Sequence, residues 1–181
     1  MTYFAIFPTP IGHCGIAWRD ESVVATHLPE GTSSATAASL AQRAKASEGE
    51  PPPAVQDAIA SITALLEGAN VDLADIVCDF NGIEPFSAAV YRATRAIPAG
   101  QTLTYGEIAA NLGDKQLARK VGAALCRNPL PVIVPCHRVI GANGKLTGFS
   151  AFGSVDTKRK MLEIEGAAKQ RDLFDDTSSD L

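Results

Sequence analysis

Residues 131–141 read Pro-Val-Ile-Val-Pro-Cys-His-Arg-Val-Ile-Gly, and this stretch organises the rest of the chain. Its run of β-branched residues predicts a short buried extended segment over residues 132–134, because proline bounds the run on both sides. Pro135 has a fixed φ and no N–H, so the backbone that leads into Cys136 is stiff and cannot continue a helix. The glycine-rich residues 141–144 then predict a turn.

The adjacent Cys136 and His137 suit a nucleophile and its base. A cysteine has a pKa of about 8.5, so only a small fraction is thiolate at neutral pH, and a neighbouring base or positive charge raises that fraction. Spacing alone favours a plainer interpretation, in which Cys136 is a small buried apolar residue and His137 a satisfied surface residue. The choice between the two depends on the rest of the chain.

The chain has 181 residues and 46% hydrophobic content, which fits one domain or two small ones with a sizeable core. No apolar run approaches the roughly 20 residues that span a bilayer. The first eight residues lack the basic flank and length of a signal peptide. We therefore expect a cytoplasmic protein with no membrane partner.

The cysteines show no CxxC spacing, and in a cytoplasmic chain we expect unpaired thiols at Cys14, Cys78, Cys126 and Cys136. Zinc could in principle gather His13, Cys14, His27 and Cys78. That spacing matches no tight ligand signature, so no metal is predicted, and zinc in the N-terminal part stays an open question.

Charge is distributed unevenly along the chain, whose net charge is −4. Residues 86–165 carry 11 Lys and Arg against 5 Asp and Glu, while the remainder carries 5 against 15. A basic half can meet phosphate while an acidic remainder keeps the protein dissolved. The alternative is that the basic helix faces are merely solvated.

Alternating and helical spacing predict a small antiparallel sheet with helices in the first eighty residues. Strands are expected over residues 2–7, 13–18, 22–27 and 76–80, and helices over 32–47 and 53–67. Residues 48–53 are linker-like, and the composition changes near residues 81–85. We therefore predict an N-terminal domain over 1–82, a second domain over 83–168, and an acidic, disordered tail over 169–181.

The second half predicts a helix-turn-helix. After a helix over residues 86–96, Thr104 and Glu107 form a capping box that starts a helix through residue 112. Asp114 then caps a helix over residues 115–127 that carries four cations and several small residues; two ordinary packed helices are the alternative. A last helix is expected over residues 155–165, with Lys158, Arg159 and Lys160 outward and Gly166 as its C-cap.

This combination resembles the O6-alkylguanine-DNA alkyltransferases, the methylated-DNA–protein-cysteine methyltransferases. The resemblance is carried by Tyr105, Arg119, Asn128-Pro129, the run from Pro135 to Val139, Gly148-Phe149-Ser150 and Glu165-Gly166. It is strong over residues 86–166 and looser over 1–80. It implies an α+β fold with a ribonuclease-H-like N-terminal domain, built on a small antiparallel sheet with helices. The C-terminal domain would be helical, with a winged-helix-like helix-turn-helix.

The resemblance also implies a DNA-repair reaction. The protein would bind double-stranded DNA in the minor groove and flip out the damaged nucleotide. It would then transfer an alkyl group, such as methyl, from O6 of guanine, and also from O4 of thymine, to its own Cys136. The transfer is irreversible, so each monomer acts once and needs no cofactor.

Residue roles carry over by position. Cys136 is the nucleophile, His137 its base through a water, and Glu165 the group that orients His137. Asn128 ties the recognition helix to the active-site segment, and Arg138 is a structural ion-pair partner. The residues that would contact DNA or the flipped base are Tyr105, Ala118, Arg119, Lys120, Arg127, Val139, Phe149 and Ser150. Among these, Arg119 replaces the flipped base in the stack, Tyr105 contacts phosphate and the guanine edge, and the Val139 carbonyl and Ser150 N–H bind the guanine.

Two departures from the family pattern concern the alkyl pocket. Phe149 stands where the family often has tyrosine, and residues 150–154 replace a shorter Gly-Gly-Leu-like stretch, so the range of alkyl groups stays open. Three other functions compete. A non-enzymatic lesion-binding protein of the same fold would lack Cys136, a thiol hydrolase would leave the Arg119 helix unused, and a transcription regulator would need a sensing domain.

Overall fold

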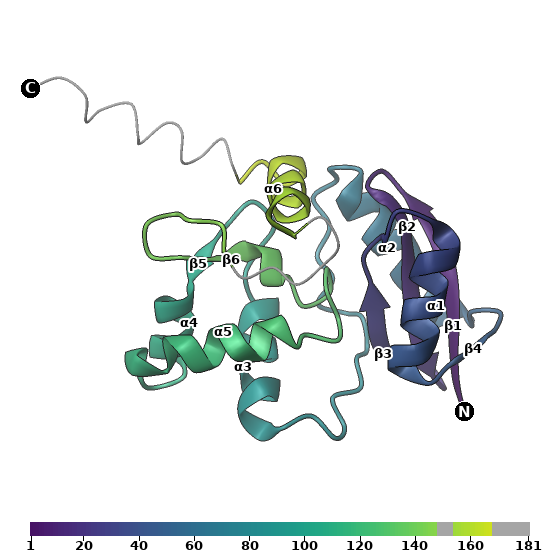
Figure 1. Ribbon diagram of the computed structural model, residues 1–181, viewed down its shortest axis with the longest axis horizontal. Coiled ribbons are helices and arrows are strands. Elements are labelled where there is room, and N and C mark those ends of the chain that lie inside the picture. Colours follow the sequence, from purple (N-terminus) through teal and green to yellow (C-terminus); the bar gives the residue numbers. More distant parts are fainter. Residues whose placement is uncertain (148–153, 168–181) are drawn as a thin grey trace, which may run out of the picture.

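The protein has a mixed α+β fold in the computed structural model, which describes residues 1–147 and 154–167 (Figure 1). A small sheet with two helices forms one side, and the remaining helices form the other side. The predicted tail over 169–181, together with Phe149 and Ser150, lies outside the described residues.

The sheet confirms the three predicted N-terminal strands. Strands β1 (Thr2–Thr9), β2 (Gly12–Arg19) and β3 (Ser22–His27) form an antiparallel meander, and the sheet order is β3-β2-β1-β4. The short strand β4 (Ser47–Glu48) pairs parallel to β1 at the junction between the helix predicted over 32–47 and the linker predicted over 48–53. Two backbone pairs are too few to leave an alternating pattern in the sequence.

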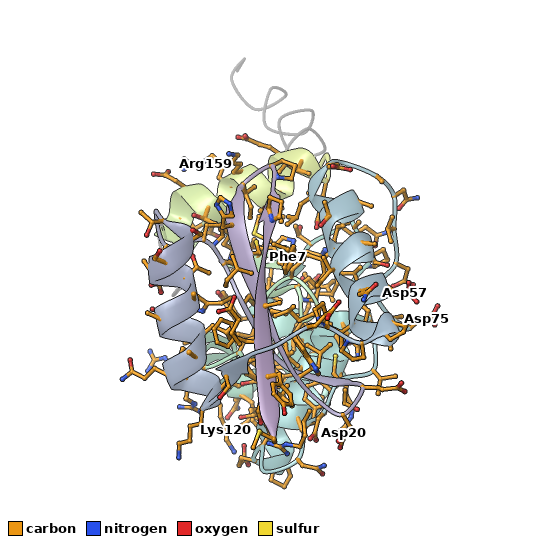
Figure 2. All side chains as sticks on the ribbon, turned by 90° about the vertical axis from the view of Figure 1, so that its right-hand side faces the viewer. Phe7, Asp20, Asp57, Asp75, Lys120 and Arg159 are labelled. Atoms are coloured by element: carbon orange, nitrogen blue, oxygen red, sulfur yellow. The ribbon has the colours of Figure 1, made fainter. Side chains whose placement is uncertain are left out.

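Two helices cover opposite faces of the sheet (Figure 2). Helix α1 (Ser33–Ala44) packs Leu40 on the face that carries Phe4. Helix α2 (Pro53–Leu66) belongs to a larger core on the face that carries Phe7. Both helices were predicted. The predicted strand over 76–80 is wrong, since only Cys78 forms a bridge, with Val23, and Asp79 turns the chain by accepting a hydrogen bond from the Asn81 N–H at 2.8 Å.

The second half contains the predicted helix-turn-helix elements. Helix α3 (Pro85–Arg95) is followed by strand β5 (Leu103–Thr104), helix α4 (Tyr105–Asn111), the 3₁₀ turn η1 (Lys115–Leu117) and helix α5 (Ala118–Cys126). The capping box is confirmed, because the Glu107 N–H donates to Thr104 Oγ1 at 3.1 Å and the Thr104 N–H donates to the Glu107 carboxylate at 2.6 Å. Asp114 caps η1, so the predicted helix over 115–127 begins as a 3₁₀ turn.

Three further elements follow in the described part of the chain, and the first of them contains Cys136. The 3₁₀ turn η2 (Cys136–Arg138) continues into strand β6 (Val139–Ile140), which pairs parallel to β5. Helix α6 (Ser154–Ile164) follows, with Gly166 at φ 76° just beyond its end, as predicted. One continuous core runs from the sheet through α2 to these elements, so the two halves share buried side chains.

The extended segment predicted over residues 132–134 is wrong. The chain instead makes a tight turn in which the Val134 N–H donates to the Leu130 carbonyl at 2.7 Å and Val132 adopts φ 76°. The predicted burial is confirmed, since Val132, Ile133 and Val134 are almost inaccessible. The β-branched run therefore reflects burial rather than extension, an ambiguity that every short apolar run carries.

Candidate active site and nucleic-acid interface

Cys136 is the first residue of η2, immediately after the tight turn and Pro135. Its N–H donates to the Val134 carbonyl at 2.7 Å, and the Arg138 N–H donates to the Pro135 carbonyl at 2.8 Å, so the backbone on both sides of the thiol is fixed. Burial raises the pKa of Cys136, while a hydrogen bond with Asn128 and the positive charge of Lys158 lower it. The thiol therefore needs local help to lose its proton.

Asn128 lies just after the end of α5 and joins this helix to the cysteine segment. Its side chain is buried, donates through Nδ2 to the Val134 carbonyl at 2.9 Å and accepts the Leu130 N–H through Oδ1 at 2.9 Å. One amide side chain thus satisfies two backbone groups of the tight turn, which a buried turn requires.

His137 is fully buried and held by Glu165 beyond the end of α6. His137 Nε2 lies 2.8 Å from Glu165 Oε1. Because a carboxylate only accepts hydrogen bonds, the proton on the imidazole belongs to Nε2, which leaves Nδ1 as an acceptor. Nδ1 has no hydrogen-bond partner among the described residues. Burial lowers the pKa of His137 despite Glu165, so the neutral imidazole is favoured.

Arg138 fixes the same carboxylate from the other side. Its Nε and Nη2 donate to Glu165 Oε2 and Oε1, both at 2.9 Å, and its Nη1 donates to the Ile97 carbonyl at 2.6 Å. Burial raises the pKa of Glu165, but its hydrogen bonds and charge interactions with His137 and Arg138 outweigh burial and lower that pKa to about 2. Glu165 is therefore a permanently ionised anchor for His137.

Lys158 on α6 was predicted to point outward, and this prediction is wrong. Its side chain is fully buried, and Nζ donates to the Val139 carbonyl at 2.5 Å and the Thr147 carbonyl at 3.2 Å. Lys158 lies three and four residues before the buried Met161 and Leu162 and seven before Glu165, so helical spacing places it on the inner face. Burial lowers the pKa of Lys158, and a negative charge on Cys136 opposes that shift.

A pocket of about 360 Å³ lies between α4 and α5, and its walls include several predicted contact residues. It is lined by Tyr105, Ala118, Arg119, Gly122, Cys126 and Thr147. The Tyr105 hydroxyl donates to the Thr147 carbonyl at 3.0 Å, and a Cβ built on Gly122 would lie only 3.8 Å from the Tyr105 ring. The small residues of α5 thus leave room beside the tyrosine.

The predicted DNA-contact residues that remain to be placed differ in their exposure. Arg119 and Arg127 are exposed on and just after α5. Lys120 is exposed as well, but its ammonium lies 4.2 Å from the centroid of the Phe86 ring. Val139 is buried, and its carbonyl already accepts from Lys158. The sequence prediction did not place Lys158, Thr147 or Cys126 near this site. Of these three, only Lys158 could have been found from the sequence, because its helical spacing places it on the inner face of α6.

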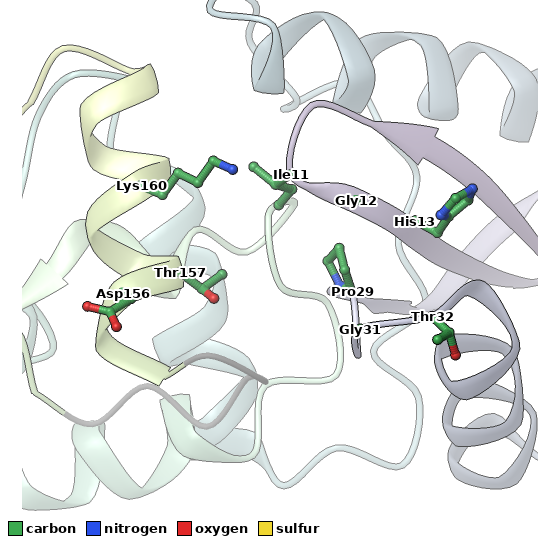
Figure 3. A pocket seen from close by; sticks show the side chains of 9 residues that line it. All are labelled: Ile11, Gly12, His13, Pro29, Gly31, Thr32, Asp156, Thr157 and Lys160. Carbon is green, nitrogen blue, oxygen red and sulfur yellow. The ribbon is translucent and has the colours of Figure 1, made fainter.

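A second pocket, of about 380 Å³, lies between the β1–β2 turn, the β3–α1 connection and α6 (Figure 3). Lys160 points toward Ile11, and Pro29 packs against Gly12. None of the residues that surround Cys136 lines this pocket.

The described residues contain no group of three or more His, Cys, Asp or Glu side chains that could hold a metal ion. His27 instead lies 2.7 Å from Glu30 and 3.1 Å from Arg43, and burial raises the pKa of Cys14 to about 11. Across residues 1–147 and 154–167, no helix is long and apolar enough to cross a membrane. None of the four cysteines forms a disulfide.

Known proteins match both the sequence and the fold. A family model described as "6-O-methylguanine DNA methyltransferase, DNA binding domain" matches residues 85–167. The methylated-DNA–protein-cysteine methyltransferase of Methanothermobacter thermautotrophicus is 35% identical over 159 residues, which cover 88% of this chain and 82% of that protein. The protein of the same name from Mycolicibacterium paratuberculosis is 36% identical to this chain, and the match covers 91% of this chain and 93% of that protein.

Solved structures agree with the sequence relatives. The O6-methylguanine methyltransferase of Mycobacterium tuberculosis superposes with a TM-score of 0.75 at 34% identity, over 92% of this chain and 94% of that chain. The complex of the same organism's OGT with DNA gives a TM-score of 0.74 at 34% identity, over 91% and 93%. With relatives covered over most of their length at these identities, the chain belongs to the methylated-DNA–protein-cysteine methyltransferase family and is a methyltransferase.

Proposed function

We propose that this protein repairs double-stranded DNA by moving an alkyl group from O6 of guanine to its own Cys136. The observation that carries the proposal is the arrangement of Cys136, His137 and Glu165, in which a permanently ionised carboxylate fixes the tautomer of the buried imidazole that directly follows Cys136 in the chain. A nucleophile, a base and a group that orients the base are the parts that such chemistry needs.

The reaction is a single displacement. The Cys136 sulfur forms a bond to the alkyl carbon as the bond between that carbon and O6 breaks. The departing guanine takes up a proton from solvent, and His137 later returns to solvent the proton that it accepts from the thiol. The thiol proton passes through a water to His137 Nδ1, the ring atom that Glu165 leaves as an acceptor. The positive charge of Lys158 favours the thiolate that forms on the way. The product thioether is stable, so each molecule acts once.

Helix α5 and its pocket are the base-binding part of the proposal. The damaged nucleotide rotates out of the duplex into the pocket beside Tyr105, at a cost of a few kcal/mol that a weakened pair reduces. The exposed Arg119 enters the stack in its place, and Lys120 and Arg127 contact phosphate. The small Ala118 and Gly122 allow close approach to the minor groove. Val139, Phe149 and Ser150 complete the base site.

Finer features of the proposal follow the family resemblance. The protein acts as a monomer, and it also accepts O4-alkylthymine. Residues 1–82 form a ribonuclease-H-like domain and residues 83–168 a winged-helix-like DNA-binding domain. The alternative, a lesion-binding protein without chemistry, is disfavoured by the thiol at position 136 and its buried histidine.

Mass spectrometry tests the proposed function. After incubation with a duplex that contains O6-methylguanine, we expect the intact mass to rise by one methyl in exchange for one hydrogen. Peptide mapping should place that methyl on Cys136. Added substrate should produce no further transfer once every chain carries a methyl. Repeated turnover, or a methyl on any other residue, would contradict the proposal.

The pH dependence of transfer tests the role of His137. Burial lowers the pKa of His137, so this base stays neutral below its usual value of about 6.5. In single-turnover measurements we expect a rate constant that is level through the neutral range and falls only at pH values below the ordinary histidine pKa. The thiol pKa is raised, so direct ionisation by hydroxide would instead make the rate climb about tenfold per pH unit across this range. Such a climb would exclude His137 as the proton acceptor.

A further inference from the structure

Strand β3 is the outer strand of the sheet, and its outer edge faces the helical half of the molecule (Figure 1). An outer strand presents backbone groups that need partners. Val23 pairs with residues 77–79, donating to the Val77 carbonyl and accepting from the Asp79 N–H, both at 2.9 Å. Farther along the same edge, the Thr26 N–H donates to the Pro129 carbonyl at 2.9 Å. The N-terminal sheet thus contacts the segment that leads to Cys136 directly.

The Thr26 side chain adds a second bond to this segment. Its hydroxyl donates to the Pro131 carbonyl at 2.6 Å, across 105 residues of sequence, and Thr26 itself is only 5% exposed. A short hydrogen bond whose donor is largely shielded from solvent restrains the position of its acceptor.

The carbonyl of Pro131 belongs to the most strained peptide of the tight turn. Val132 is β-branched and has φ 76°, a conformation that costs such a residue about 1–3 kcal/mol and persists only where the surroundings impose it. The peptide plane between Pro131 and Val132 sets this angle, and its carbonyl oxygen is the atom that Thr26 binds. Rotation of that plane would relieve Val132, and the Thr26 hydroxyl opposes the rotation.

The carbonyl of Val134 links the turn to the backbone of Cys136. The oxygen of Val134 accepts from Asn128 Nδ2 at 2.9 Å and from the Cys136 N–H at 2.7 Å. Asn128 therefore holds the turn from the recognition helix, while Thr26 holds it from the sheet. If the peptide plane between Pro131 and Val132 rotated, the turn would change shape. The Val134 carbonyl, and with it the backbone of Cys136, would then be displaced.

We infer that Thr26 is a positioning residue for alkyl transfer: from the N-terminal sheet, it holds the strained turn that places the Cys136 sulfur for in-line attack. The inference rests on the proposed function, because it assigns to Thr26 an effect on the rate of that reaction. Thr26 acts through the backbone and touches neither the sulfur nor His137. It should affect how fast a bound lesion reacts and leave DNA affinity unchanged.

Three variants test this inference. Thr26→Val removes the hydroxyl and keeps the shape, Thr26→Ser keeps the hydroxyl, and Thr94→Val removes a buried hydroxyl whose bond, to the Val90 carbonyl, lies within α3. The rate constant for methyl transfer is measured in a single turnover, with O6-methylguanine duplex in saturating excess. Affinity for the same duplex is measured by fluorescence anisotropy with the unreactive Cys136→Ala background, and folding by thermal unfolding.

We expect Thr26→Val to react about tenfold more slowly, as the loss of roughly 1.4 kcal/mol from one hydrogen bond implies. Its affinity for the duplex should stay within about twofold of the wild-type affinity. That change is smaller than the loss of one hydrogen bond to DNA would cause. Thr26→Ser should restore the rate to within about twofold, and Thr94→Val should lose stability without slower transfer. If valine prevents folding, Thr26→Ala removes the same donor without placing a methyl against the Pro131 carbonyl.

Two outcomes overturn the inference, and both differ from failure of the proposed function. A folded Thr26→Val or Thr26→Ala variant that reacts at the wild-type rate shows that the hydroxyl does not position the thiol. Equal slowing in Thr94→Val shows a general effect of stability. If the unchanged protein transfers no methyl, the proposed function itself fails.

Discussion

Replacing Cys136 with alanine should abolish methyl transfer completely and leave a protein that still binds the damaged duplex. The sulfur is the only atom on which the proposed reaction builds its new bond, so no residual rate is expected. The fold should persist, because Cys136 is half-buried and its backbone N–H, rather than its side chain, makes the bond to Val134. Electrophoresis of the duplex after enzymatic digestion would show whether O6-methylguanine remains, and anisotropy would measure binding.

Cys78→Ala is the matched control for this experiment. Cys78 is also half-buried, and its thiol donates only to the Ile76 carbonyl at 3.5 Å, away from α5 and its pocket. This variant should transfer one methyl per chain. Demethylation of the duplex by Cys136→Ala would show that another group is the acceptor. Loss of binding as well as transfer would show that the thiol is needed for recognition.

Replacing Glu165 with glutamine should both destabilise the protein and slow transfer. The carboxylate accepts two hydrogen bonds from the buried Arg138 and one from His137. Its removal leaves a buried cation without a counter-charge, which costs about 3–5 kcal/mol in such pairs. The pKa gives a similar figure, because lowering it from 4.5 to about 2 corresponds to about 3 kcal/mol.

The pH dependence of that stability has a definite sign. Since the pKa of Glu165 is lowered on folding, its contribution is fully present above its unfolded value of 4.5 and is lost as pH falls toward about 2. Urea unfolding at neutral pH should therefore separate Glu165→Gln from the wild type, and the difference should shrink in acid. Transfer should slow by at least about a hundredfold, because His137 loses the group that fixes its proton.

Glu163→Gln controls for the change of charge on the same helix. Glu163 is exposed, so its substitution should alter the free energy of unfolding by less than about 0.5 kcal/mol. Equal stability of the two glutamine variants at neutral pH would contradict the buried triad of Glu165, His137 and Arg138 as the structure describes it.

Much of the fold could be predicted because its signals are local. The capping box of Thr104 and Glu107 lies within one turn of chain, and the strands of the N-terminal meander are six to eight residues long and joined by short turns. Positions of this kind follow from propensity and spacing alone. The predicted roles of Cys136, His137 and Glu165 came instead from the family resemblance, because residues 28 positions apart leave no local trace of their contact.

The failures have physical causes that are equally specific. The run at residues 132–134 was predicted to be extended because burial and extension favour the same β-branched residues. The turn that forms instead depends partly on Asn128 and Thr26, which lie outside the run and leave no signal within it. Lys158 was assigned to the surface by its charge, although its helical position relative to Met161 placed it inside. For Lys158, helical spacing is therefore a better guide than charge to its place beside the Cys136 site.

Thr26 in the N-terminal sheet holds the turn before Cys136, and Glu165, far along the chain, holds His137 and Arg138 after it, so the order of synthesis affects when the site is assembled. Contacts between distant residues form slowly and late, after the intervening chain is available. A nascent chain that has exposed Cys136 but not yet α6 has no partner for His137. Under the proposed function, the Cys136 thiol of such a chain would react slowly until Glu165, just after α6, is in place.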